Sequence, residues 1–381
     1  MGKLLVVGND SETLSVKLAQ ALKEFDVDDV VLMEDRLEIG RLVKDITVEF
    51  SKIDDIRASA ERLTAIRDTI VKCGISRPMM MACDPHGELV TGGICCSYEQ
   101  LDDVPSMGPD AVDSVEALNI ALEGVADKVS KIFASIATKI ENLGTRIRRM
   151  FTSYEHNMSA VEATLKNVVV DDQIFSSKEI LAFSKSDFDK IVTSCTAVCD
   201  LFDGTTFKQI TDIAVDGSPD SYLKIWKIIA GMFSPIADDV ANHIGFDVKV
   251  NEIGHSVRVQ SLGLGHPKRK ELLVETRSTV GELGWSTNDL TQAIATIRKL
   301  IDKLGGTRGI RNGLATFVRS LSSTYYDNRG VATRSFSSTP VRRINKLLNS
   351  LITLLSGVDN MTDKLVVSVT DLSKAAIKSA K

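Results

Sequence analysis

The stretch from Val115 to Val168, VEALNIALEGVADKVSKIFASIATKIENLGTRIRRMFTSYEHNMSAVEATLKNV, decides the fold of this chain. Large apolar residues recur along it at steps of three and four, the spacing of one face of an α-helix. No proline occurs between Pro109 and Pro219, so one helix of about 80 Å could run through the whole stretch. Pairs of consecutive four-residue steps should straighten its supercoil locally. The centre of this predicted seam consists of Val125, Val129, Ile132, Ile136, Ile140, Leu143 and Ile147.

So narrow an apolar stripe needs a partner surface. A chain of 381 residues can supply one, so we expect the stripe to pack against other helices of the same chain. The alternative is a second copy, with the stripe as the seam of an oligomeric coiled coil. Asp113, followed three residues later by Glu116, is a plausible helix start. The weakest part is the stretch from Tyr154 to Met158, where a turn would divide the helix.

The composition is ordinary for a globular chain, with 43% hydrophobic and 25% charged residues. The longest run without a charge, 347–358, has 12 residues, fewer than the ~18 that a membrane span requires. No signal peptide is visible, because no basic region precedes an apolar one at the N-terminus. The six cysteines form no disulfide pattern, which favours a reducing compartment. We therefore expect no membrane partner.

Charge is distributed unevenly along the chain. Residues 1–130 contain 25 acidic and 13 basic residues, a net charge of −12, whereas the remaining residues contain 26 and 33, a net charge of +7. An acidic first part and a basic last part indicate two different environments. We expect an acidic N-terminal region over 1–110 that acts as a propeptide or cap, a helical domain over 111–245 built on the long helix, and a basic helical domain over 246–381.

The N-terminal region allows two interpretations. Lys3–Asn9 (KLLVVGN) could be a strand, followed by a helix from Ser11 and a second apolar run at Val30–Met33, as at the start of an α/β fold. No glycine-rich phosphate loop follows Lys3–Asn9, so we prefer a small helix-rich cap. A convincing helix follows over 37–70, and Gly74 should end it. Residues 75–109 are rich in proline and glycine and predict a loop region.

The rest of the chain predicts shorter helices and a small β-hairpin. Apolar residues alternate at Phe246, Val248 and Val250 and again at Val257 and Val259, around a turn at 252–255. Residues 271–276 could add a third strand. We predict a mainly α fold, in which shorter helices pack on the long amphipathic helix and the hairpin is an insertion. The shorter helices are expected at 177–183, 187–201, 207–215, 220–233, 286–304, 314–321, 341–355 and 361–380, with Asp187 and Ser286 as N-caps.

Little in the sequence indicates catalysis. Cys195 and Cys199 share a helix face and should be buried apolar residues. Cys83, His86, Cys95 and Cys96 fit no zinc spacing. No serine, histidine and acid order supports a catalytic triad. We therefore expect no enzyme, no metal site and no cofactor.

One segment has a composition that favours nucleic-acid contact. Between Gly305 and Lys346, eight basic residues accompany a single acid, Asp327, and aromatic residues lie among them. Such a segment suits non-specific contact with phosphates. The alternative is a basic surface that is solvated or pairs with acidic residues elsewhere. The candidate DNA contacts are Arg308, Arg311, Arg319, Arg329, Arg334, Arg342, Arg343 and Lys346.

Short phrases also occur in a characteristic order along most of the chain. They are ERLTAIRDTI at 61–70, GISR at 74–77, SYE at 97–99, SVEALNIALEG at 114–124, RIRRMF at 146–151 and GELGWS at 281–286. This order resembles the internal head proteins of large contractile-tailed bacteriophages. The resemblance implies a structural protein of the virion that lies inside the capsid with the genome. Its partners would be other virion proteins and packaged DNA, and it would occupy the host cytoplasm during assembly.

The resemblance further implies trimming by a protease that cuts after Glu when a small residue stands two positions earlier. Matching tripeptides end at Glu61, within a predicted helix, and at Glu116 and Glu123, near the start of the long helix. A cut after Glu123 would remove 24 acidic and 12 basic residues and leave a product with a net charge of +7. Such a product would tolerate packed DNA better than its precursor.

Two other functions stay open. One is a self-associating coiled-coil scaffold in a phage tail or baseplate. The other is an α/β enzyme with Lys3–Asn9 as its first strand.

Overall fold

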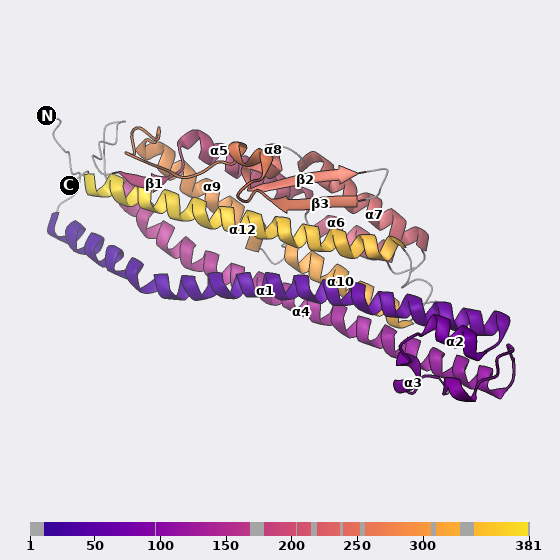
Figure 1. Cartoon of the computed structure of the whole chain (residues 1–381). Coiled ribbons are helices and arrows are strands. Elements are labelled where there is room, and N and C mark those ends of the chain that lie inside the picture. Colours follow the sequence, from indigo (N-terminus) through magenta and orange to yellow (C-terminus); the bar gives the residue numbers. More distant parts are fainter. Residues whose placement is uncertain are drawn as a thin grey trace.

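The computed structural model describes residues 11–95, 97–167, 179–202, 204–214, 219–236, 239–251, 256–305, 310–327 and 339–379. Two long helices, α1 (Ser11–Cys73) and α4 (Pro109–Asn167), lie side by side and form the spine of an elongated molecule (Figure 1). At about 1.5 Å per residue, α1 is about 95 Å long. The other helices stack along this spine, and the predicted mainly α fold with a small hairpin is confirmed.

The predicted long helix is present as α4, and it is continuous through Tyr154 and Met158, both of which are buried. It begins at Pro109 rather than at Asp113. Proline suits the first position of a helix because its missing N–H would have no partner there. Val129, Ile136, Ile140, Leu143 and Ile147 are buried, while Val125 and Ile132 are partly buried and pack against the same core.

The buried face of α4 is wider than the predicted seam. Phe133, Ala137 and Phe151, each one position after a seam residue, are also buried. The reason is the number of neighbours, since α4 contacts α1, α9 (Thr287–Gly305), α10 (Ile310–Asp327) and α12 (Thr339–Ser379) of the same chain. Packing within the chain is thus confirmed, and α4 keeps no free seam for a coiled coil with a second copy.

The N-terminal half differs most from expectation. A single helix, α1, covers both the helix expected from Ser11 and that over 37–70, and the apolar run Val30–Met33 lies inside it. Lys3–Asn9 lies outside the described residues. The described strands form two antiparallel pairs only, so the described part of the chain does not support the α/β alternative. Gly74 ends α1 as predicted, at φ +78°, where its N–H donates to the Ile70 carbonyl at 2.8 Å.

The region 75–109 is not a plain loop. It contains α2 (Arg77–Cys83), α3 (Glu88–Thr91) and the 3₁₀ turn η1 (Tyr98–Gln100), and it caps the far end of the spine (Figure 1). A small core separate from the main one holds this end together. The members of that core are Ile66, Ile70, Ile75, Met80, Leu89, Leu101, Ala111 and Leu118. We call residues 71–120 the tip.

The remaining helices follow the predicted order with shifted bounds. They are α5 (Lys185–Leu201), α6 (Gly204–Ala214), α7 (Pro219–Phe233) and α8 (Asp239–His243), with 3₁₀ turns η2 (Ser234–Ile236) and η3 (Pro267–Glu271). Two predictions are wrong. The segment 180–182 is a strand, and the helices expected at 341–355 and 361–380 are one helix, α12. The helix α12 continues through Gly357, where the Phe246 ring packs so closely that a Cβ atom would clash with it.

The predicted hairpin is confirmed as β2 (Phe246–Asn251) and β3 (Ser256–Ser261). Lys249 lies opposite Arg258 in its register. The hairpin contacts α7 and α12. The third strand expected at 271–276 is wrong in position and partner, since β4 (Thr276–Ser278) shares only Thr276 with that range and pairs with β1 (Ile180–Ala182).

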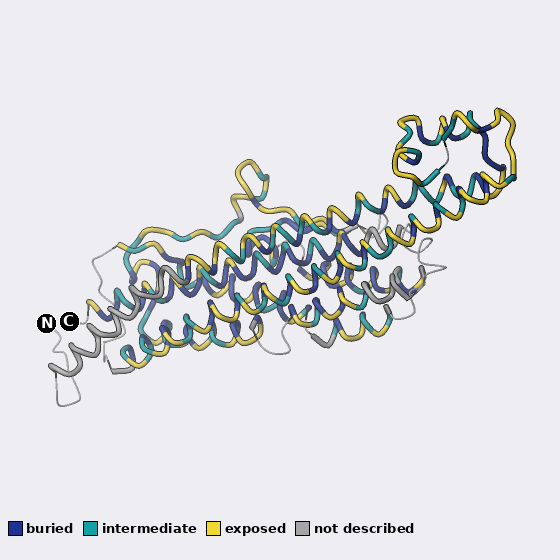
Figure 2. The backbone as a smooth tube through the Cα atoms, turned by 90° about the horizontal axis from the view of Figure 1, so that it is seen from below, coloured by how far each residue is buried: buried dark blue, intermediate teal, exposed yellow. Residues whose placement is uncertain are grey.

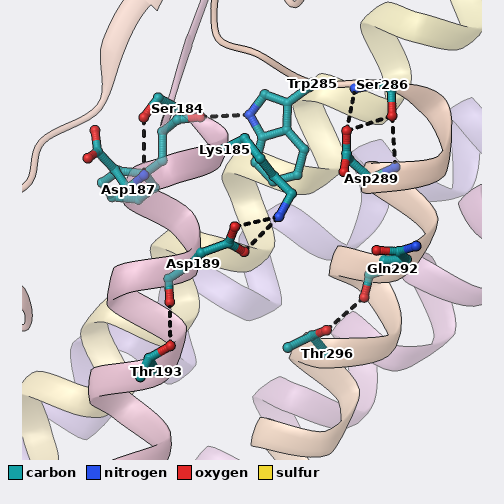
Figure 3. Close-up of polar contacts among 11 residues, drawn as sticks. Ser184, Lys185, Asp187, Asp189, Thr193, Trp285, Ser286, Asp289, Gln292 and Thr296 are labelled. Atoms are coloured by element: carbon teal, nitrogen blue, oxygen red, sulfur yellow. Dashed lines mark hydrogen bonds and ion pairs between the residues drawn. The ribbon is translucent and has the colours of Figure 1, made fainter. Parts of the chain in front are cut away.

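Helices α5 and α9 begin next to each other, and their caps are linked (Figure 3). Ser184, not the expected Asp187, caps α5 by accepting a hydrogen bond from the Asp187 N–H at 3.1 Å. Ser286 caps α9 as predicted, and Asp289 completes a capping box by accepting from the Ser286 N–H at 3.0 Å. Trp285 Nε1 donates to the Phe183 carbonyl at 2.9 Å, which fastens the two starts together.

The main hydrophobic core runs along the whole body. Figure 2 shows that the buried residues lie where the helices face one another. The core joins Ile46 and Phe50 of α1 with Phe133 of α4, Phe188 of α5 and Leu351 of α12. All three regions expected from the sequence therefore contribute to one core.

Candidate polyanion-binding surface

The structure divides the candidate DNA contacts into four groups. Arg311 is buried on α10 and forms an ion pair with Asp359 of α12, so the prediction that it contacts DNA is wrong. Arg319 is half exposed and donates to Glu141 at 2.9 Å. Lys346 is exposed on α12. Arg308, Arg329 and Arg334 lie outside the described residues, as do the side chains of Arg342 and Arg343.

Arg311 has a structural role instead. Its side chain approaches α4 at Gly144, where a Cβ atom would lie 3.5 Å from the Arg311 Cβ atom. Burial raises the pKa of Asp359, and the charge of Arg311 acts against that rise. Asp359 Oδ1, Arg311 Nε and Arg311 Nη1 are buried without a hydrogen-bond partner among the described residues. A charge that is held in this way cannot reach a phosphate.

A different basic surface lies on the hairpin and on the turn that follows it. The described cations here are Lys249 on β2, Arg258 on β3, and Lys268, Arg269 and Lys270 on η3. We call these five residues the hairpin patch. Arg258, Arg269 and Lys270 are exposed and form no ion pair with any described residue. Three cations without an acidic partner among the described side chains therefore face solvent on one small insertion.

A single carboxylate holds the hairpin patch together. Asp247 is buried, and its oxygens lie 3.2 Å from Lys268 Nζ, 3.6 Å from Lys249 Nζ and 3.7 Å from His266 Nε2. Burial raises the pKa of Asp247, but the hydrogen bond from Lys268 and the nearby positive charges lower it below its ordinary value. Residues 246–271 contain five Lys and Arg residues and three acidic residues, so the segment that carries the hairpin patch keeps a net positive charge.

The pairing of the two strands brings two of these positive charges close together. Lys249 and Arg258 are directly opposite each other in the register, and like charges in that position destabilise a hairpin. The apolar face of the hairpin is fixed by Val248 and Val257, which are buried. Lys249 and Arg258 must therefore remain together on the solvent face. An anion that bridges the two cations would relieve their repulsion.

Sequence reasoning missed the hairpin patch, although two signals were present. The run His266–Lys270 (HPKRK) is basic, and the alternation that predicts the hairpin also places Lys249 and Arg258 on its polar face. The sequence alone could not predict the register of the two strands, nor that η3 lies next to Asp247.

A cavity of about 460 Å³ lies beside the hairpin, between α1 and α12. A polar cluster closes one side of it. Arg36 Nη2 donates to Tyr154 Oη at 2.7 Å and to Asp363 Oδ1 at 2.8 Å, and Tyr154 Oη also donates to Asp363. Burial raises the pKa of Tyr154, and Asp363 adds to that rise. This cluster ties α1, α4 and α12 together, while Lys364 at the same cavity adds a further exposed cation.

The two cleavage candidates lie within α4. Glu116 and Glu123 are exposed, but Leu118 and Leu122 between them are buried. Because α4 begins at Pro109, both residues lie inside the helix rather than in its first turn.

Other reactive side chains have structural settings. Cys195 and Cys199 are buried as predicted, and burial raises the pKa of both thiols. Ser194 Oγ lies 2.9 Å from His243 Nδ1, a pair that the sequence did not indicate, but Ser194 is only 3% exposed. Within the part of the chain that the structure describes, no three His, Cys, Asp or Glu residues are grouped to hold a metal ion.

The geometry defines an elongated helical protein that carries an exposed basic hairpin. Comparison of the chain with protein-family models, curated proteins and solved structures finds no match. Among the described helices, none is both long enough and apolar enough to cross a membrane.

Proposed function

We propose that the chain is a non-enzymatic structural protein of a bacteriophage particle, an internal head protein that lies inside the capsid against the packaged genome. The observation that supports DNA contact is the hairpin patch, with three exposed cations that have no acidic partner among the described residues. The order of short phrases described above supports the class of particle. The long, internally braced spine suits a protein that is built into a larger assembly.

The hairpin patch favours phosphates over bases. Its cations lie on a short hairpin and a single 3₁₀ turn rather than on a helix that could enter a groove. Contacts of this kind position a protein on the DNA backbone without reading sequence. Because binding releases condensed counterions, affinity should fall steeply as salt rises.

The test is binding of the full chain to fluorescent duplexes of unrelated sequence at several salt concentrations. We expect equal affinity for all duplexes. The variant Lys249→Gln, Arg258→Gln, Arg269→Gln, Lys270→Gln should reduce the slope of log affinity against log salt by about 3 to 4. Lys268 is retained, because its removal together with that of Lys249 would leave the buried carboxylate of Asp247 without either lysine partner.

A matched control removes four exposed lysines elsewhere, with Lys44→Gln, Lys72→Gln, Lys128→Gln and Lys208→Gln. It changes the net charge equally, so its salt slope should stay near that of the parent chain. Equal slopes for both variants would remove the hairpin patch as the contact surface. Particles purified by density gradient should contain the protein in DNA-filled heads, as detected by mass spectrometry. Its restriction to the unassembled fraction would overturn the virion proposal.

A further inference from the structure

The tip carries an unusual concentration of exposed apolar side chains. It projects past the ends of α10 and α12, so that none of the described helices of the body covers it (Figure 1). Along its surface, large apolar residues lie 52–73% exposed, and Figure 2 shows long exposed segments there. Exposed apolar groups that cluster on one part of a molecule mark interaction sites. These residues are Val71, Met81, Val104, Met107, Val112 and Ile120.

The same surface is acidic. The tip contains eight acidic residues and two basic ones, a net charge of −6. Four of the acidic residues, Asp102, Asp110, Asp113 and Glu116, are exposed and form no ion pair with any described residue. They lie in the same short segments as Val104, Met107, Val112 and Ile120. Along residues 102–120, exposed apolar side chains thus alternate with carboxylates that have no cation partner among the described residues.

This surface is rigidly held. Ile75 and Ser106 exchange backbone hydrogen bonds of 2.8 and 2.9 Å, and the Arg77 N–H donates to the Asp102 carbonyl at 2.9 Å. The exposed segment 102–107 is therefore fixed at both ends. Behind it, the buried Asp84 accepts from Tyr98 Oη at 2.5 Å and from the Leu89 N–H at 2.7 Å. A surface that is already ordered loses little conformational entropy on binding.

The charge of the tip discriminates among possible occupants. Nucleic acid and anionic lipid would be repelled by its carboxylates, and so would the tip of a second copy. We infer that the tip is a docking surface for a partner protein, which contributes a basic segment with an apolar face. The partner's cations would pair with Asp102, Asp110, Asp113 and Glu116, while its apolar face would cover Val104, Met107, Val112 and Ile120. This inference does not depend on DNA binding by the hairpin patch.

The test uses the full chain and three labelled 18-residue peptides. The first peptide is an amphipathic helix of Lys and Leu, and the second has Glu in place of Lys. The third contains the same residues as the first in a scrambled order, so that its helix has no apolar face. Only the first should bind well, with an affinity that falls as salt rises. The variant Val104→Ser, Met107→Ser, Val112→Ser, Ile120→Ser should lower the affinity for the first peptide at least tenfold. A second variant, Asp102→Asn, Asp110→Asn, Asp113→Asn, Glu116→Gln, should do the same and flatten the salt dependence.

Because all eight positions are exposed, neither variant opens a cavity in the core. The matched control is Met33→Ser, Leu37→Ser, Val48→Ser, which removes exposed apolar residues from α1 outside the tip and should not affect binding. Equal binding of all three peptides, or binding that neither tip variant weakens, would overturn the inference. Self-association in sedimentation experiments that the tip variants abolish would also overturn it, since the occupant would then be a second copy.

Discussion

At the scale of single residues, the buried ion pair of Arg311 and Asp359 shows charged side chains in a packing role. Both side chains are about 95% buried and join α10 to α12. Removing one member of such a pair leaves the other charge uncompensated, whereas replacing both with apolar residues can be neutral or stabilising. The pair is therefore expected to fix how the helices meet rather than to supply stability.

The prediction for this pair is a double-mutant cycle. Arg311→Met should lower the free energy of unfolding by about 3–5 kcal/mol, because Asp359 stays buried without its partner. Arg311→Met with Asp359→Leu should return it to within about 1 kcal/mol of the parent chain, since no charge then remains in the core. Urea denaturation measures both values. A single variant that is as stable as the parent would show that Arg311 is not needed in the core.

Residue-scale features differed in how well the sequence predicted them. Gly74 and the cap at Ser286 were predicted correctly, because each depends on neighbours within a few residues. The burial of Arg311 was not, since its partner lies 48 residues further along the chain and its own helix gives no sign of it. Composition treats all eight basic residues of 305–346 alike, whereas packing removes Arg311 from the surface.

At the scale of elements, hydrophobic periodicity predicted α4 well, and tertiary contacts decided the rest. The sequence predicted two helices at 341–355 and 361–380, but α12 is continuous between them, and the Phe246 ring packs against Gly357 there. The three residues of β1 became a strand because they pair with β4, almost a hundred residues away. The apolar run Val30–Met33 could be read as a strand or as part of a helix, an ambiguity that periodicity alone does not resolve.

The packing of α4 makes a direct prediction. Ile136→Asp places a carboxylate where the side chain is fully buried between helices of the same chain. We expect a loss of several kcal/mol in the free energy of unfolding, through a buried charge without a partner. Ala134→Asp, two positions away on the exposed face of α4, is the control and should change it by about 0.5 kcal/mol or less. Similar melting curves for the two variants would show that Ile136 is not in the core.

At the scale of the whole molecule, the acidic and basic parts of the chain do not become separate bodies. The sequence predicted the asymmetry of charge, and the structure places an acidic apolar tip at one end of the spine and the hairpin patch on the body. Between them, α1 of the acidic part packs along α4. Ion pairs such as that of Lys139 Nζ with Glu49 Oε1, at 2.8 Å, connect the two helices. Composition gave no sign of this shared core, because it depends on which apolar faces meet.

This shared core changes what cleavage could achieve. A protease binds its substrate in an extended form, and both Glu116 and Glu123 lie in the regular helix α4. In native digestion with an endoproteinase that cuts after Glu, we expect both sites to resist until α4 opens locally. Ala121→Pro should expose Glu123, because proline in a helix interior costs about 3 kcal/mol or more. Mass spectrometry of the fragments over time measures both effects.

A cut after Glu123, once made, should not release the acidic part. Residues Ile46, Phe50 and Ile53 of α1 would remain in the core beside Val129, Phe133 and other residues of α4. We expect residues 1–123 and 124–381 to elute together in size-exclusion chromatography at neutral pH and to separate only in denaturant. Under that outcome, trimming alone leaves the net charge of the particle protein at −5, before its new termini are counted. Separate elution of the two fragments under native conditions would instead support a removable propeptide, and with it the change of net charge to +7 that release of 1–123 implies.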